Sequence, residues 1–123
     1  MKEKLVLEYT INSSPKVLFS RLSTPGGLAE WFADDVTLRG DIYSFLWDGT
    51  EQKAEVAQKK DNKYIRFKWV DEPDSYFEFK IDIDEITKDV ALVVTDMVEP
   101  DEIEDTTELW NSQISELMHV IGL

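Results

Sequence analysis

The stretch DEIEDTTELWNSQISELMHVIGL, residues 101–123, decides the fold of this chain of 123 amino acids. It contains a series of residues spaced alternately by four and three positions: Ile103, Thr107, Trp110, Ile114, Leu117 and Ile121. All but the threonine are apolar, and the spacing draws one apolar stripe along one helical face. Such a helix is roughly 30 Å long at ~1.5 Å per residue. Because the preceding residues are mostly strand-like, the helix must bury its stripe against a sheet.

Acidic residues mark the expected start of this helix. Asp101 is followed three positions later by Glu104, which resembles a capping box. The acids clustered there also suit the positive end of the helix dipole. We therefore expect the helix to begin at residue 101.

Alternating apolar and polar residues predict strands through most of the remaining sequence. The expected strands cover residues 5–11, 36–38, 42–47, 51–59, 63–70, 76–83 and 90–97. Asp48-Gly49 is a strong signal for a hairpin turn. Sequential strands joined by tight turns form an antiparallel meander, with one packed face and one face in water.

Two short helices are expected after the first strand. Ser14 and Pro15 suit the start of the first helix. Thr24 can cap the second, over residues 28–32, although Gly26 and Gly27 are poor helix formers. The order of elements predicts a single α+β domain over residues 1–123, with two short helices, a run of strands and one long C-terminal helix.

The excess of acidic over basic residues argues against some classes of binding partner. With 13 basic and 26 acidic residues, the formal net charge is -13. Nucleic-acid phosphates and anionic membrane surfaces would be repelled, so we expect neither as a partner. The chain has no cysteine, which excludes disulfides, thiolate nucleophiles and cysteine-bound metals. It also lacks a signal peptide and a long apolar segment, so we expect a soluble, cytoplasmic protein.

Two segments near the N-terminus resemble a known superfamily. Residues 14–19, SPKVLF, and residues 22–32, LSTPGGLAEWF, are similar to a stretch in START-like, or SRPBCC, proteins related to the activators of a heat-shock chaperone ATPase. The strand run and the closing helix with Trp110 extend the resemblance to nearly the whole chain. The chain also resembles small bacterial START-like domain proteins in which amino-acid binding has been proposed. The resemblance implies a helix-grip fold, in which a curved antiparallel sheet of six to seven strands packs against the long helix.

Members of this superfamily share a cavity between the concave face of the sheet and the long helix. The resemblance therefore implies a small-molecule ligand in a central cavity. We expect the cavity to be lined by Trp31, Phe45, Trp47, Phe67, Trp69, Phe77, Phe79, Asp96, Trp110 and Ile114. Ligand sites are concave and largely apolar, which suits this set. Ordinary core packing of the same aromatic residues stays open as the alternative.

Asp96 is the one acidic residue in this set. It shares the parity of Leu92 and Val94, so its carboxylate would face inward near the end of a strand, at the cavity mouth. There it would hold a ligand amine or a buried arginine, because an unpaired buried charge is costly. In the alternative, the strand has already ended and Asp96 is solvated.

No catalytic or metal-binding constellation is visible. Asp34 and Asp35 fall in a short link where aspartates are usually turn or surface residues. His119, the only histidine, lies off the apolar stripe with no catalytic grouping around it. A phosphate loop, a dinucleotide fingerprint, a paired-histidine metal motif and a nucleophile elbow are all absent. We predict no catalytic residue, no metal and no cofactor.

Two functions remain from the sequence. The first is non-enzymatic binding of a small molecule, such as an amino acid or a small apolar compound. The second is a protein-interaction module resembling the chaperone activators, whose negative charge would steer it toward a chaperone with a basic surface. We expect a monomer or a homodimer, in which exposed aromatic residues such as Tyr43 or Tyr76 would pair across subunits.

Overall fold

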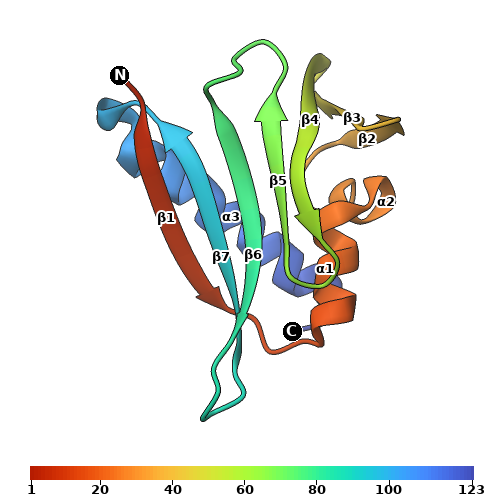
Figure 1. The fold of residues 1–123 in the computed structure, drawn as a ribbon, viewed down its shortest axis with the longest axis vertical. Coiled ribbons are helices and arrows are strands. Elements are labelled where there is room, and N and C mark those ends of the chain that lie inside the picture. The colour runs from red at the N-terminus through yellow and green to blue at the C-terminus, as the bar shows by residue number, and fades with distance from the viewer.

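A curved, seven-stranded antiparallel sheet lies against a long helix in the computed structural model, which describes all of residues 1–123 (Figure 1). The strands are β1 (Glu3–Thr10), β2 (Asp35–Arg39), β3 (Ile42–Trp47), β4 (Thr50–Lys60), β5 (Tyr64–Trp69), β6 (Tyr76–Ile83) and β7 (Val90–Val98). Their order in the sheet is β1-β7-β6-β5-β4-β3-β2, so the first strand pairs with the last and the others form a meander. The predicted α+β class is confirmed, and the sheet has the larger of the two expected strand numbers.

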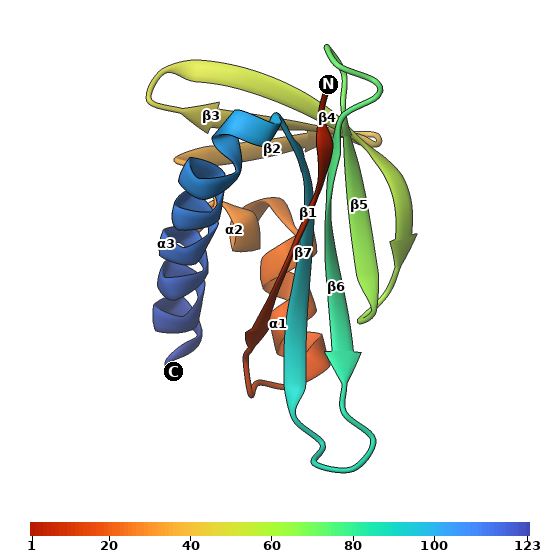
Figure 2. The ribbon, with the colours of Figure 1, turned by 90° about the vertical axis from the view of Figure 1, so that its left-hand side faces the viewer.

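The helices all lie on one side of this sheet. They are α1 (Pro15–Ser23), α2 (Pro25–Leu28), the short 3-10 turn η1 (Pro100–Glu102) and α3 (Ile103–Ile121). Figure 2 shows that β2, β3 and the first part of β4 arch over the N-terminal end of α3. The pairing of β4 with β5 shifts register between Val56 and Gln58, and a bulge of this kind bends a strand. No helix combines the length and the hydropathy that a lipid bilayer would require of a spanning segment.

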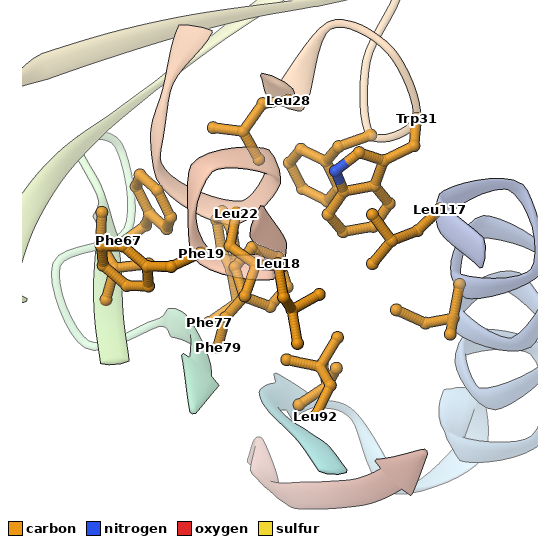
Figure 3. Close-up of a cluster of buried hydrophobic side chains, with 14 of the residues drawn as sticks. Leu18, Phe19, Leu22, Leu28, Trp31, Phe67, Phe77, Phe79, Leu92 and Leu117 are labelled. Carbon is orange, nitrogen blue, oxygen red and sulfur yellow. The ribbon is translucent and has the colours of Figure 1, made fainter. Parts of the chain in front are cut away.

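The core fills the space between the sheet and the helices. Strand residues with the predicted inward parity are buried, among them Phe67, Phe77, Phe79, Leu92 and Val94. Helix α1 contributes Leu18 and Leu22, and α3 contributes Trp110, Ile114 and Leu117. Figure 3 shows side chains of α1 lying between those of the sheet and Leu117 of α3. The apolar stripe of residues 101–123 is therefore buried at its centre, while Ile103, Thr107 and Ile121 at its edges are half-buried.

The start of the long helix differs from the prediction. Helix α3 begins at Ile103, after the 3-10 turn, and its N-cap residue is Glu102, whose side chain makes no capping hydrogen bond. The capping box at Asp101 was therefore wrong. Pro100 explains the difference, because its fixed φ and missing N–H suit the first position of a tight turn.

The second short helix also lies earlier than residues 28–32. Helix α2 starts at Pro25, directly after Thr24, and ends at Leu28. We predicted the start of this helix too late because the two glycines have a weak helix propensity. Pro25 at the first helical position favours the earlier start that the structure shows. Residues 29–33 form hydrogen-bonded turns instead, in which the N–H of Phe32 donates to the carbonyl of Leu28 at 2.8 Å.

Tyr43, expected on the surface, is instead buried in the core with 3% of its surface exposed. Its hydroxyl donates to the backbone carbonyl of Ser23. It shares inward parity with Phe45 on β3, which explains its position and removes it as a residue that could pair across subunits. Tyr76 is half-buried, and the guanidinium of Arg66 lies over its ring at 4.2 Å from the centroid.

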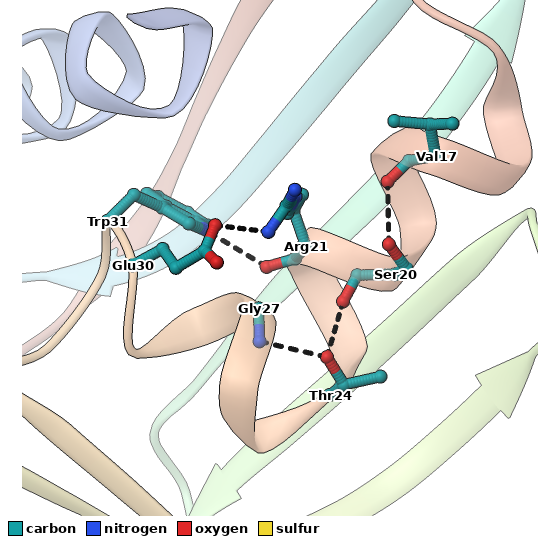
Figure 4. A network of polar contacts seen from close by, with 7 residues as sticks. All are labelled: Val17, Ser20, Arg21, Thr24, Gly27, Glu30 and Trp31. Atoms are coloured by element: carbon teal, nitrogen blue, oxygen red, sulfur yellow. Dashed lines mark hydrogen bonds and ion pairs between the residues drawn. The ribbon is translucent and has the colours of Figure 1, made fainter. Parts of the chain in front are cut away.

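Thr24 and Gly27 join α1 to α2 in a tight junction (Figure 4). The hydroxyl of Thr24 donates to the carbonyl of Ser20 at 2.6 Å and accepts the N–H of Gly27 at 3.0 Å. The two helices approach so closely that a Cβ atom at Gly27 would lie 2.3 Å from the Ser20 carbonyl oxygen and 2.7 Å from the Cα of Arg21. Only glycine fits there without movement of the backbone.

The neighbouring Gly26 supplies a matched control for this junction, because a Cβ atom there would meet nothing within 4 Å. We predict that Gly27→Ala lowers the free energy of unfolding by roughly 1–3 kcal/mol, the usual cost of overpacking. Gly26→Ala should be neutral or raise it by up to about 1 kcal/mol. Urea unfolding of both variants measures the difference, and equal stabilities would contradict the close approach at Gly27.

Candidate ligand-binding site

Most of the aromatic residues predicted to line a cavity pack against one another in the interior. Phe45, Phe67, Phe77, Phe79 and Ile114 have 0–1% of their surface exposed, and they belong to one core cluster. The interior of the domain between the sheet and α3 is thus largely filled by the protein's own side chains. These five residues therefore form ordinary core packing, which the sequence left open as the alternative to a cavity lining.

The ring of Phe32 fills the centre of this cluster. Its centroid lies 5.2–5.7 Å from the ring centroids of Phe45, Trp47, Phe77 and Trp110. The set of predicted lining residues omitted Phe32, although it directly follows Trp31 in the sequence. The turns after α2 carry its side chain inward, and only the tertiary structure places it between sheet and helix.

An opening remains at the edge of the core, between α3 and the arch of β3 and β4. This aromatic hollow has a volume of about 280 Å³. Its apolar walls are Phe32, Trp47, Leu109 and Trp110. Its polar groups are Gln52, Asp96, Thr106 and Gln113. Asp96 is the one side chain among them that carries a charge at neutral pH.

A second hollow of about 350 Å³ adjoins the first and shares Asp96 and Gln52 with it. We call it the charged hollow, because it is also lined by Lys2, Lys53, Asp71 and Glu72. Trp69, Ser75 and Met97 complete its walls. The carboxylate of Asp96 therefore stands where the two hollows meet.

The carboxylate of Asp96 is partly buried and has no ionic partner within the protein. Its Oδ2 accepts the indole N–H of Trp110 at 2.9 Å. The ammonium group of Lys2, which lines the charged hollow, contacts Glu72 at 2.6 Å instead. None of the six ion pairs of the chain includes Asp96. Its inward direction follows from the parity of β7, where it pairs with Phe77 of β6 and Leu5 of β1.

Burial raises the pKa of Asp96 above the ordinary value of an aspartate. The Trp110 indole, the backbone N–H of Met97 and the charge of Lys2 each lower this pKa, but they offset the effect of burial only in part. The folded protein thus holds a carboxylate whose ionised form is less favourable than in water.

The four tryptophans have different surroundings. Trp47 donates its indole N–H to the Phe32 carbonyl at 2.7 Å, and the side-chain amide of Gln113 donates to the same oxygen at 3.2 Å. Trp31 lines neither hollow, and its indole N–H donates to the carbonyl of Arg21 at 2.8 Å (Figure 4). Of the predicted lining residues, the structure brings Trp47, Asp96 and Trp110 together at the aromatic hollow and places Trp69 beside them in the charged hollow.

Several lining residues were missed from the sequence. A row of α3 residues beside the buried stripe also lines the aromatic hollow: Thr106, Leu109 and Gln113. Leu109 is an apolar residue outside the stripe, and this was the one feature of the sequence that could have indicated the row. Gln52 shares the parity of Ala54 and Val56 on β4, which could have placed it inward. Lys2 carried no such signal, because its position depends on the pairing of the first and last strands.

The aromatic hollow presents hydrogen-bonding groups, one carboxylate and aromatic rings. No group of three or more His, Asp or Glu side chains is placed to hold a metal ion. His119 is exposed in the last turn of α3. Asp34 accepts the backbone N–H of Asp48 at 2.8 Å and is an exposed residue.

The raised pKa of Asp96 predicts how a neutral substitute changes stability. Because the folded state favours the protonated form, ionisation of Asp96 costs stability as the pH rises through its folded pKa. Asp96→Asn keeps an oxygen acceptor for Trp110 and removes this cost. The variant should therefore be more stable than the wild type at pH 7, with a difference that shrinks toward pH 4 and below.

Chemical denaturation across this pH range measures the effect. Asp82→Asn is the matched control, because Asp82 is exposed on β6 and its replacement removes the same charge without burial. The raised pKa of Asp96 would be contradicted if the wild type were more stable than Asp96→Asn at pH 7. It would also be contradicted if Asp82→Asn raised the free energy of unfolding by the same amount as Asp96→Asn.

Comparisons with known proteins agree on the fold. Residues 1–123 match the family model of a START-like superfamily domain. A solution structure of a Bacteroides fragilis protein is 41% identical, with a TM-score of 0.70, and the match covers 99% of this chain and 93% of that one. A comparison with curated proteins found no match.

Two further solved structures share the fold at lower identity. The solution structure of the Aha1 dimer from Colwellia psychrerythraea is 16% identical, with a TM-score of 0.80 and coverage of 94% of this chain and 93% of that one. The crystal structure of a Mesorhizobium loti protein is 19% identical, with a TM-score of 0.80 and coverage of 97% and 96%.

Proposed function

The chain belongs to the START-like superfamily, and from this premise we propose that it is a non-enzymatic module that binds a small molecule in the aromatic hollow. The observation that supports this most is the carboxylate of Asp96. It faces an opening lined by Trp47, Trp110 and Leu109, and no cation of the protein pairs with it. A partly buried acid without a partner is costly, and a ligand would offset that cost.

The size of the hollow limits the size of the ligand. Ligand sites in proteins usually measure about 300–1,000 Å³, so an opening of about 280 Å³ suits a compound at the small end. An amino acid or another small apolar compound is of this size. Because the centre of the core is filled by Phe32, such a ligand would bind beside α3 near the surface rather than in the middle of the fold.

The groups that face the hollow support binding rather than catalysis. Asp96 is the only titratable side chain among them, and its carboxylate is hydrogen-bonded to Trp110 rather than to the hydroxyl of Thr106. General acid–base and nucleophilic mechanisms need a positioned pair of groups. Because the one acid does not contact a nucleophile, the hollow is better suited to holding a compound unchanged.

Two tryptophan substitutions on α3 test the site. Thr106→Trp would fill the aromatic hollow, whereas Ser115→Trp places the same side chain on the exposed side of the helix away from it. In a thermal-shift screen of amino acids and small apolar metabolites, we expect at least one compound to stabilise the wild type and Ser115→Trp but not Thr106→Trp. At ~100 times its Kd, such a compound adds about 2.7 kcal/mol to the free energy of unfolding. A full screen without any shift would reject the proposal.

A protein partner, such as a chaperone, is the second candidate. The turn between β6 and β7 extends beyond the rest of the fold (Figures 1 and 2) and carries Ile86, which is 91% exposed. Asp84 fixes this turn by accepting the N–H groups of Ile86 and Thr87 at 2.8 and 2.9 Å. A rigid turn with an apolar tip and acidic neighbours suits an apolar pocket bordered by basic groups.

Retention by an immobilised chaperone at low salt would test this second candidate. Ile86→Ser should abolish salt-sensitive retention, whereas Leu38→Ser, which changes an exposed apolar residue on the distant edge strand β2, should not. Equal retention of both variants would show that the turn does not mediate the interaction.

A further inference from the structure

We infer that the ligand of the aromatic hollow carries an ammonium group, which pairs with Asp96 beside the indole rings of Trp47, Trp69 and Trp110. The inference deepens the proposed function and rests on it. It names the chemical class of the ligand: a small organic amine, positively charged at neutral pH, with a short apolar body.

The distribution of charge around Asp96 supports a cationic ligand. In the aromatic hollow Asp96 is the only charged side chain. In the charged hollow, the ammonium of Lys2 contacts Glu72 at 2.6 Å and Ser75 at 3.1 Å, so it is already engaged. Lys53 lies 3.8 Å from Glu51. The carboxylate of Asp96 is thus left for a cation from outside, and a charge-assisted hydrogen bond is the strongest contact it can make.

The rings around Asp96 favour an organic cation. Trp47 on β3, Trp69 on β5 and Trp110 on α3 come from three separate elements and line the two hollows that meet at this carboxylate. The rings of Trp47 and Trp69 are 6.3 Å apart at an angle of 58°. Tryptophan is the aromatic side chain that attracts cations best over its face, and the attraction grows where water is excluded.

A hydrated metal ion does not fit the same groups. Calcium takes six to eight oxygen ligands, and magnesium keeps a nearly octahedral shell. The hollow offers one carboxylate with amide and hydroxyl groups from Gln52, Gln113 and Thr106, and no cluster of acids. The apolar wall of Phe32 and Leu109 instead matches the hydrocarbon part of an amine.

Four compounds with nearly the same branched body test the inference. Isoamylamine is cationic, isoamyl alcohol is neutral, isovalerate is anionic and leucine is a zwitterion. Each is titrated into the 123-residue chain while the indole N–H signals of the four tryptophans are followed by NMR. The signal of Trp31 serves as an internal control, because this residue lines neither hollow and its indole N–H donates to the Arg21 carbonyl.

We expect isoamylamine to shift the signals of Trp47, Trp69 and Trp110 in a saturable way and to leave that of Trp31 in place. The alcohol and isovalerate should bind at least about tenfold more weakly. Asp96→Asn should weaken isoamylamine binding roughly ten- to hundredfold, the usual value of a hydrogen bond to a charged group, and leave the alcohol unaffected. Leucine binding tighter than isoamylamine would place amino acids within the class, and weaker binding would favour simple amines.

Three results would overturn the inference: binding of the alcohol or of isovalerate as tight as that of the amine, no effect of Asp96→Asn, or no response to isoamylamine. The comparison of compounds on the wild-type protein stands even if the variant fails to fold. A neutral compound that stabilises the wild type but not Thr106→Trp would keep the proposed function while rejecting the ammonium ligand, so the two failures are distinguishable.

Discussion

The contact of one ring, that of Phe32, with sheet and helix together is the constraint on which the rest of the structure depends. It touches Phe45 of β3, Phe77 of β6 and Trp110 of α3, elements that are otherwise far apart along the chain. Phe32 reaches this place because α2 turns back tightly on α1 at Thr24 and Gly27. The junction of these two helices therefore places the ring that lies between the sheet and the long helix and that also lines the aromatic hollow.

The packed core and the aromatic hollow lie side by side between the sheet and α3, and they share Phe32 and Trp110. Aromatic rings fill the centre and supply stability by excluding water from a large apolar area. Beyond these packed rings, side chains of β3, β4 and α3 line the aromatic hollow without filling it. Asp96 stands at this boundary, held by the Trp110 indole on one side and open to both hollows on the other. A stability cost is thus concentrated at the one place where a ligand would make contact, a pattern common to functional sites.

Local patterns predicted the elements well, and the reason is physical. Strand alternation and the helical stripe report directly which side chains leave water, so the inward parity of Phe77, Phe79 and Asp96 was visible in the sequence. The position of α2 was not, because propensity disfavoured the glycines while close packing at Gly27 required one. Whether an inward aromatic lines a cavity or fills it depends on residues from other elements, here Phe32, and no local pattern contains that information. Lys2 reaches the charged hollow for the same long-range reason, because the pairing of the first and last strands places it there.

The residues that line the aromatic hollow differ in how strongly the fold constrains them, and the difference follows from whether they lie on β7 or on α3. Asp96 belongs to a strand that is hydrogen-bonded on both sides, so its position is tied to the backbone of the whole sheet. Thr106, Leu109 and Gln113 instead occupy helix positions outside the buried stripe, where a change of side chain disturbs little of the core. In the proposed binding site, substitutions at these three positions would change the shape of the aromatic hollow while Asp96 keeps its place. The selectivity of such a site would then change through surface positions of one helix without a loss of folding stability, which is in keeping with a fold that hosts many different functions.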